Sequence, residues 1–264
     1  MAVGKLREGR VAVGTMVRMV GNPAVALIAA NAGLDFIMLD LEQGSFSLET
    51  VENVFELGRS VGLGCFVRVP ELSKGYVSRC LDLGATGVMV PMLESVEQAR
   101  LLVHWAKFAP LGSRGFSGVG PHTGYRNRGG EGTIAFMAEA NSETITIAQI
   151  ETAQAIKHIE SIAAVEGLDA LLIGPNDLAI SMGCLGDLMG EQMDRAIFRV
   201  AEAAQAHGKI FGMHAPDALT ERWLSRGLKL VMRSSDANVL LAGFKALALA
   251  EKWVTQAKEV GRKP

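Results

Sequence analysis

Acidic side chains follow two of the short apolar runs in this sequence, and they are the first candidates for chemistry. Glu151 directly follows the run 144–150, and Asp177 comes three residues after the run 170–174. If these runs are neighbouring parallel strands, their ends lie about 4.8 Å apart, and the two carboxylates repel each other unless a cation or a proton intervenes. Oxygen ligands without His or Cys suit a hard divalent ion such as Mg²⁺ or Mn²⁺. The alternative is that both residues are first-turn acids that stabilise helix N-termini.

Arg68 lies inside the apolar run 65–69, where an unpaired charge is very costly. It therefore needs an anionic partner. A substrate carboxylate or a developing enolate oxygen would serve, which makes Arg68 a catalytic candidate. A structural ion pair with Asp40 or Glu42, which lie where the run 35–41 ends, would serve equally well.

Residues 174–177, with the sequence Gly-Pro-Asn-Asp, end one run and begin a helix. The backbone N–H groups of Asn176 and Asp177 could donate to a substrate carboxylate there, or the turn is an ordinary strand–helix connection. His214, directly after the run 209–213, and His122, in a glycine-rich segment, are candidates for proton transfer near neutral pH. The alternative for each histidine is a structural role.

The apolar runs that carry these residues alternate with stretches long enough for helices, several of which open with Ser or Thr, typical helix N-caps. Such alternation predicts a parallel sheet with helices on its outer face, and eight units in about 250 residues fit a closed barrel. We expect an α/β fold, a (β/α)8 TIM barrel that forms a single domain over residues 1–264, with the active site at the carboxyl ends of its strands. The eight runs are residues 11–17, 35–41, 65–69, 87–91, 144–150, 170–174, 209–213 and 228–232, and typical helical stretches are 47–61, 73–83, 95–107 and 152–164.

Composition excludes several classes of protein. The chain has 264 residues, 49% of them hydrophobic, and a formal net charge of −2, which argues against disorder and against a basic surface for nucleic acid. No apolar run approaches the roughly 18 residues of a membrane span. The odd number of cysteines and the absence of a signal-like N-terminal segment favour reduced thiols and a cytoplasmic location.

Two segments depart from the even spacing. Residues 108–142 contain eight glycines, and we expect them to form a long functional loop after the fourth strand, on the active-site face. The last expected helix, residues 238–257, is apolar on nearly every side, whereas a helix that coats one barrel keeps a polar outer face. It is therefore expected to bury a second face in a homo-oligomer.

Taken together, several strings of the sequence resemble the HpcH/HpaI family of metal-dependent class II pyruvate aldolases over nearly the whole chain. The resemblance implies a barrel that binds Mg²⁺, Mn²⁺ or Co²⁺ and assembles as a hexamer, a trimer of dimers, by exchanging the last helix. It also implies aldol cleavage or addition. In the addition, a 2-oxo acid such as pyruvate chelates the metal, a base removes a methyl proton, and the enolate so formed adds to an aldehyde. The strings are DFIMLDLEQGSFSLET, FVRVPE, CLDLGATGVMVPMLESVEQA, PLGSRGFS, AQIETAQAI, VEGLDALLIGPNDLAISMG and MRSSDANVL.

The resemblance also assigns roles position by position. The matching positions are Glu151 and Asp177 for the metal ligands; Arg68 for the arginine on the keto or enolate oxygen; Gln149, Gly174, Pro175 and Asn176 for the pyruvate site; Asp40 and Glu42 for acids that hydrogen-bond metal-bound waters; and Asp82 for the acid of a His–Asp pair.

One position departs from the family pattern. The family motif reads Asp-x-Glu-His, and here Gln43 stands in place of the histidine. Glutamine does not exchange a proton near pH 7, and general acid–base catalysis contributes about 10²–10⁴-fold, so ordinary aldolase activity should be impaired. Either a metal-bound water is the base, or His214 or His122 supplies the group, or the reaction differs. The expected catalytic residues are thus Arg68, Gln43, Asp82 and His214.

Other functions stay open at this point. An acyl-CoA lyase of the citramalyl-CoA or malyl-CoA type would need basic residues at the pocket mouth, for which Arg114, Arg126 and Arg128 are candidates. An oxaloacetate-type decarboxylase would need the metal and the arginine but no histidine. A non-catalytic 2-oxo-acid binding protein would bind without turnover.

Overall fold

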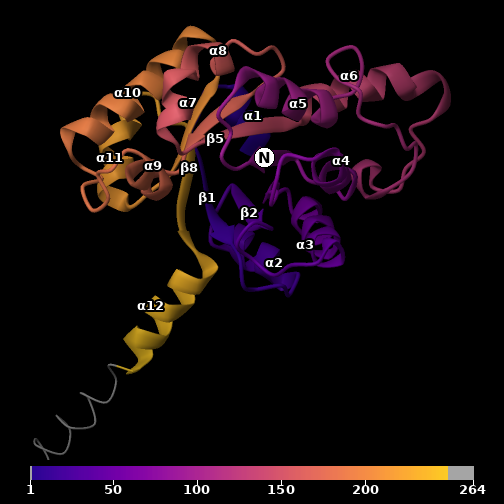
Figure 1. The fold of residues 1–264 in the computed structure, drawn as a ribbon. Helices are drawn as coiled ribbons and strands as arrows, with labels where there is room; N and C mark the ends of the chain where they lie inside the picture. The colour runs from indigo at the N-terminus through magenta and orange to yellow at the C-terminus, as the bar shows by residue number, and fades with distance from the viewer. Residues whose placement is uncertain (1, 249–264) are drawn as a thin grey trace, which may run out of the picture.

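A closed parallel barrel is the centre of this protein (Figure 1), in a computed structural model that describes residues 2–248. The described residues contain eight strands, and each pairs with its neighbours in sequence while β1 also pairs with β8. This confirms the predicted (β/α)8 TIM barrel. The strands are β1 (Ala12–Val17), β2 (Phe36–Asp40), β3 (Gly64–Arg68), β4 (Gly87–Val90), β5 (Ile145–Ile150), β6 (Ala170–Ile173), β7 (Ile210–His214) and β8 (Leu230–Ser235).

The helices cover the outside of the barrel, and several begin where the sequence predicts a cap. The side chains of Ser47, Ser73, Ser95 and Thr152 each accept a hydrogen bond from a backbone N–H of the first turn that follows. The helices are α1 (Ala2–Arg7), α2 (Ala24–Asn31), α3 (Leu48–Ser60), α4 (Lys74–Asp82), α5 (Val96–Ala106), α6 (Thr133–Glu143), α7 (Ala153–Lys157), α8 (Ile159–Ala163), α9 (Pro175–Ser181), α10 (Glu191–Ala206), α11 (Asp217–Leu224) and α12 (Asp236–Ala248), with short 3-10 turns at Pro121–Thr123 and Gly130–Gly132.

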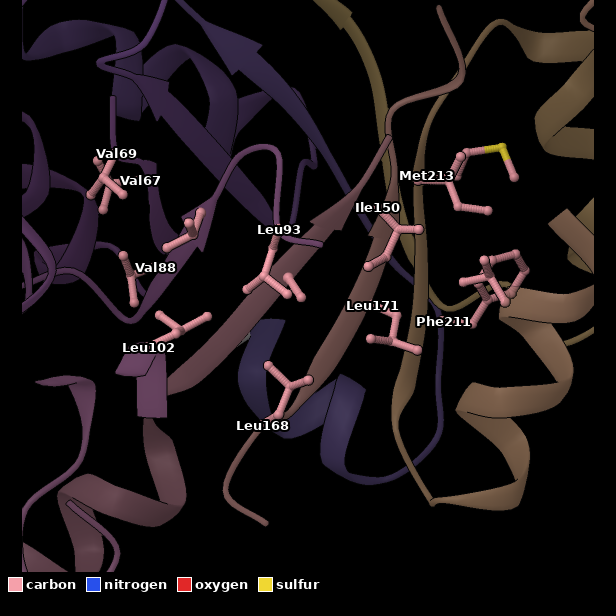
Figure 2. Packing of buried hydrophobic residues seen from close by; sticks show 14 of the residues in the cluster. Val67, Val69, Val88, Leu93, Leu102, Ile150, Leu168, Leu171, Phe211 and Met213 are labelled. Atoms are coloured by element: carbon pink, nitrogen blue, oxygen red, sulfur yellow. The ribbon is translucent and has the colours of Figure 1, made fainter. Parts of the chain in front are cut away.

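Alternate residues of each strand belong to two separate cores. One set packs outward under the helices, and Figure 2 shows part of it, including Val88, Ile150, Leu171 and Met213 on successive strands. The other set fills the barrel interior and packs with Ala2 and Leu6 of α1. The strand residues of this interior set are Ala12, Met16, Phe36, Met38, Phe66, Met89, Ile145, Ile147, Ala170, Leu172, Leu230 and Met232.

Two expectations about the elements are wrong. Residues 108–142 do not follow β4 directly: they come after α5, and their second half forms α6 and the two 3-10 turns. The segment therefore connects a helix to a strand, a connection that returns to the amino ends of the strands rather than to the active-site face. The expected helix 152–164 is two helices, because His158 leaves the helical conformation between α7 and α8.

The last described helix, α12, extends away from the barrel (Figure 1). Five of its large apolar residues are exposed, namely Val239, Leu240, Leu241, Phe244 and Leu247. The expected helix 238–257 runs past residue 248, so its second half lies outside the described residues. Across residues 2–248, no helix is both long and apolar enough to span a membrane.

Candidate active site at the carboxyl ends of the strands

The alternate strand residues that point into the barrel form its interior phase. At the carboxyl ends of the strands, which we call the mouth of the barrel, these inward positions bring polar side chains together. Asp40 follows Phe36 and Met38 in the interior phase of β2, and its register partner on β3 is Arg68. Gln149 and Glu151 continue the interior phase of β5, and His214 continues that of β7. The interior is therefore apolar along most of its length and polar only where the strands end.

Arg68 is held by two carboxylates. Its Nε and one terminal nitrogen donate to the two oxygens of Asp40 at 2.9 and 2.6 Å, and its other terminal nitrogen lies 2.6 Å from Glu42. Burial alone would lower the pKa of Arg68, but the bonds to Asp40 and the charge of Glu42 raise it above its ordinary value. The arginine is only 4% exposed, so its orientation is fixed and its charge permanent.

Glu151 is the carboxylate of the site whose pKa departs most from its ordinary value. It is 2% exposed, and burial, together with the charges of Asp177 and Glu42, raises its pKa to about 7 against the opposing N–H of Met92 and charge of Arg68. The Met92 N–H donates to Oε1 at 2.8 Å from a backbone with φ of 52°, a conformation uncommon outside glycine. The hydrogen bond from this strained backbone orients the Glu151 carboxylate at the mouth.

The turn between β6 and α9 lies against Glu151. A side chain at Gly174 would press on the Glu151 carboxylate, so glycine permits their contact. Asn176 and Asp177 are exposed in the first turn of α9, whereas Pro175 is buried. Gln149, which is 4% exposed, donates to Glu151. Gly174, Gln149 and Asp177 therefore lie close to one carboxylate, that of Glu151.

The donor set fits a hard divalent cation held mostly by water and ligand. Burial raises the pKa of both Glu151 and Glu42, and the charge of Asp177 raises both further, which a cation between these groups would relieve. In residues 2–248, no three His, Cys, Asp or Glu side chains converge as a ready-made metal cluster. Glu151 and Asp177 would thus leave open positions, as suits Mg²⁺ with one or two carboxylates.

Gln43 lies beside this cluster. The carboxylate of Asp40 accepts hydrogen bonds from the backbone N–H groups of Glu42 and Gln43 at 3.1 and 3.3 Å, which shapes the turn after β2. The side chain of Gln43 is exposed at the mouth. The position is therefore accessible to a bound molecule, although glutamine is no acid or base.

His214 faces the same mouth from β7. Its Nε2 lies 2.9 Å from the carbonyl oxygen of Ser234. Because a carbonyl only accepts, Nε2 carries the proton and Nδ1 of the neutral ring is an acceptor. Burial, then the nearby charges of Arg18 and Arg68, lower the pKa of His214 against opposing contributions from Ser234 and Asp40, which favours the neutral ring.

Arg18 is a site residue that sequence reasoning missed. It directly follows β1, whose interior residues include Ala12 and Met16, so the same period of two places position 18 at the mouth. Its Nε lies 3.7 Å from Asp40 Oδ2. The alternation of β1 was the available signal.

Asp82 and His122 do not join the cluster within this chain. Asp82 is the last residue of α4, which leads into the amino end of β4, whereas Gln43 follows the carboxyl end of β2. Asp82 instead accepts two hydrogen bonds from Arg114, at 3.0 and 2.7 Å, and its backbone oxygen lies 3.2 Å from the His122 ring. Within one chain, Asp82 and His122 therefore lie away from this mouth, and this geometry does not support the catalytic role expected of Asp82 or a role for His122 there.

Comparisons with known proteins point to one family. A family model described as HpcH/HpaI aldolase/citrate lyase matches residues 18–241. A 4-hydroxy-2-oxovalerate aldolase of Novosphingobium aromaticivorans is 36% identical, over 90% of this chain and 89% of the relative. A 4-hydroxy-4-methyl-2-oxoglutarate aldolase of Chaetomium globosum is 38% identical, over 79% of this chain and 77% of the relative. The crystal structure of an HpcH/HpaI aldolase from Desulfitobacterium hafniense is 31% identical, with a TM-score of 0.83 over 99% of this chain and 96% of that one.

Proposed function

The chain belongs to the HpcH/HpaI aldolase/citrate lyase family and is a carbon–carbon lyase of the class II aldolase type, and on that premise we propose that it cleaves and forms 4-hydroxy-2-oxo acids through a pyruvate enolate. The observation that carries the proposal is the arrangement at the mouth, where Arg68 faces a group of carboxylates around the buried Glu151. A fixed cation beside carboxylates suited to a divalent metal is what an enolate needs.

The metal would be held by Glu151 and Asp177, with Asp40 and Glu42 available to hydrogen-bond its waters. When bound, a cation such as Mg²⁺, Mn²⁺ or Co²⁺ supplies Lewis-acid polarisation of the 2-oxo group. The pyruvate half of the substrate would lie along Gln149, Gly174, Pro175 and Asn176, around the carboxylate of Glu151.

Arg68 stabilises the charge that develops on the keto oxygen. Cleavage breaks the bond between C3 and C4; its electron pair passes to the 2-oxo oxygen as the enolate forms, while the C4 hydroxyl loses its proton and becomes a carbonyl. Because Asp40 and Glu42 already orient Arg68, its guanidinium needs little reorganisation when this charge appears.

His214 is the proposed proton carrier, since Gln43 cannot exchange a proton. Its Nδ1 is the free acceptor of a ring fixed through Nε2, and its lowered pKa keeps it able to take a proton at neutral pH. His122 lies with Asp82 at the other end of the barrel. Arg114 is buried there too, so it does not mark a CoA site at the mouth.

We also propose that the protein is a homo-oligomer, a hexamer built as a trimer of dimers that exchange the last helix. The support is the apolar surface of α12, where Phe244 is 64% and Leu247 is 72% exposed. A helix with this surface is stable in water when a second copy covers it. A cytoplasmic location stays a prediction.

The experiment that tests the function is deuterium exchange of the pyruvate methyl group, followed by NMR with Mg²⁺, Mn²⁺ or a chelator. We expect metal-dependent exchange, lost in Asp177→Ala and kept in Asp187→Ala, an exposed aspartate beyond α9. Exchange that survives in chelator-treated Asp177→Ala would contradict the metal assignment. Pyruvate binding without exchange would favour decarboxylation, a CoA substrate or a binding protein.

A further inference from the structure

The side chain of Arg18 holds a buried donor that no described residue satisfies. Its Nε is inaccessible to solvent and makes no hydrogen bond within residues 2–248. The carboxylate oxygen Oδ2 of Asp40 lies 3.7 Å away, which is too far for a hydrogen bond. Asp40 is already occupied by the two bonds from Arg68. The Arg18 side chain as a whole is 33% exposed, so its guanidinium is reachable from solvent although Nε is buried. With this donor unpaired, Arg18 is suited to an anion from outside the chain.

The charges around Arg18 leave room for such an anion. The charge of Arg18 lowers the pKa of both Glu42 and His214, so its guanidinium lies in the mouth and not on the outer surface. The ring of His214, whose Nε2 lies 2.9 Å from the Ser234 carbonyl, brings no competing negative charge. Asp40 and Glu42 are both paired with Arg68, which leaves Arg18 as the less engaged of the two arginines.

The loop that carries Arg18 is rigidly anchored. The carboxylate of Asp236, at the start of α12, accepts hydrogen bonds from the backbone N–H groups of Arg18, Met19 and Val20 at 3.1, 3.0 and 2.7 Å. Gly44 packs against the backbone of Arg18 from the turn after β2. A group held on both sides in this way is preorganised for binding.

Arg18 lies farther from Glu151 around the mouth than Arg68 does, because it follows β1 on the other side of Asp40. Glu151 follows β5, and in the closed barrel β1 is four strands away from β5 in either direction. A 2-oxo acid whose keto end lies at Glu151 and Arg68 thus directs its other end toward the side formed by β1, β8 and β7. Arg18 follows β1 and His214 ends β7, so both side chains come from that side of the barrel.

We infer that Arg18 binds a carboxylate on the electrophile half of the substrate, so that the preferred substrate is a 4-hydroxy-2-oxo diacid and not one that releases a neutral aldehyde. The inference rests on the proposed function and names the substrate class of the same site. In the cleavage, C3 leaves C4 with the bonding pair as the pyruvate enolate. C4 becomes the carbonyl of a product that keeps its own carboxylate on Arg18.

Two compounds that differ only in that carboxylate provide the test. 4-Hydroxy-2-oxoglutarate carries a carboxylate at C5 where 4-hydroxy-2-oxovalerate carries a methyl group, and both release pyruvate on cleavage. The wild-type protein, loaded with Mg²⁺, is expected to show the higher kcat/KM for the diacid. Arg18→Met should lower the ratio of kcat/KM for the diacid to kcat/KM for the valerate by about 10- to 100-fold, as for a lost charged hydrogen bond. Arg18→Lys should restore part of it.

The matched control is Arg233→Met. Arg233 lies on β8, and its side chain is half exposed and bound to Asp217 at 2.6 Å. Removing it should leave the ratio of the two kcat/KM values unchanged. Equal losses for both compounds in Arg18→Met, or a wild-type preference for the valerate, would overturn the inference.

Deuterium exchange of the pyruvate methyl group separates this inference from the proposed function. Exchange retained in Arg18→Met shows that the variant is folded and that enolate chemistry is intact, so the substrate ratio then decides the role of Arg18. Exchange without cleavage of either compound overturns the inference and leaves the enolate chemistry standing. No exchange in the wild type overturns both.

Discussion

Gly174 and Glu151 are in such close contact that a β-carbon at position 174 would lie 2.5 Å from the Oε2 atom of the carboxylate. Since φ at Gly174 is −96°, alanine is compatible with the backbone there, and only the contact opposes it. We predict that Gly174→Ala displaces the Glu151 carboxylate and weakens metal binding while the barrel stays folded. The measurement is the Mg²⁺ concentration needed for half-maximal deuterium exchange, which should rise at least tenfold.

Gly75→Ala is the control for that change. Gly75 lies in α4, and a β-carbon there meets nothing within 4 Å, so alanine should leave the metal requirement unchanged. It should also stabilise the helix by up to about 1 kcal/mol, the usual difference between the two residues. An unchanged metal requirement in Gly174→Ala would mean that Glu151 does not hold the cation.

The raised pKa of Glu151 predicts how the stability of the metal-free protein depends on pH. Between about pH 4.5 and 7 the folded chain keeps a proton on Glu151 that the unfolded chain has lost, so the free energy of unfolding falls as the pH rises and levels off above pH 7. The full loss is about 3 kcal/mol, because each pKa unit is worth about 1.4 kcal/mol.

Urea unfolding in a chelator from pH 4.5 to 8 measures this slope. Glu151→Gln should remove the contribution of this group, and Glu143→Gln, at the exposed end of α6, should not. Mg²⁺ should reverse the effect above pH 7, since a cation favours the charged carboxylate. An identical slope in the wild type and Glu151→Gln would contradict the raised pKa.

Much of the site could be predicted because it depends on the barrel alone. Once eight strands are recognised, Asp40, Arg68 and Glu151 must lie at one end of the barrel, and the alternation of each strand turns them inward. The same alternation on β1 places Arg18 at this end of the barrel. Because Arg18 follows the last apolar residue of that run, however, it looks in the sequence like an ordinary polar loop residue.

The predictions for Asp82 and His122, and the contact that orients His214, could not be obtained from the sequence for different physical reasons. Asp82 was assigned by resemblance as the acid of a His–Asp pair, and His122 was one candidate for the missing proton carrier. Neither assignment takes account of the end of the barrel that the last turn of α4 and the segment after α5 face. The carbonyl of Ser234 that orients His214 depends on a backbone with φ of 58°, at an irregular pairing of β8 with β1. No propensity predicts such a conformation at a serine.

His214→Gln tests the proton carrier. The variant removes the exchangeable proton but keeps a polar side chain, and we predict that deuterium exchange slows by about 10²- to 10⁴-fold. Binding of pyruvate should change far less. His158→Gln, in an exposed position between α7 and α8, is the matched control.

The rescue variant makes this test specific. In the His214→Gln background, Gln43→His returns a titratable ring to the mouth, and partial recovery of exchange is expected because position 43 is exposed beside Asp40. Normal exchange in His214→Gln would exclude His214 as the carrier.

The surface of α12 predicts an assembly that a single charge can break. Leu241 and Phe244 are 53% and 64% exposed on a helix that leaves the barrel, so a partner that covers them gains from the burial of both side chains. Burying a large apolar side chain is worth about 1.5–3 kcal/mol, and a buried unpaired carboxylate costs more. Leu241→Glu and Phe244→Glu should therefore dissociate the oligomer, with little change in the circular dichroism of the barrel.

Sedimentation velocity at micromolar concentration measures the outcome. Phe198→Glu, an exposed apolar position on α10, is the control, because it adds the same charge away from α12 and should leave the assembly intact. If the α12 variants keep the wild-type sedimentation coefficient, α12 is not the assembly surface. If they dissociate but retain metal-dependent exchange, one chain holds a complete site, which agrees with the position of Arg68, Glu151 and His214 at one mouth.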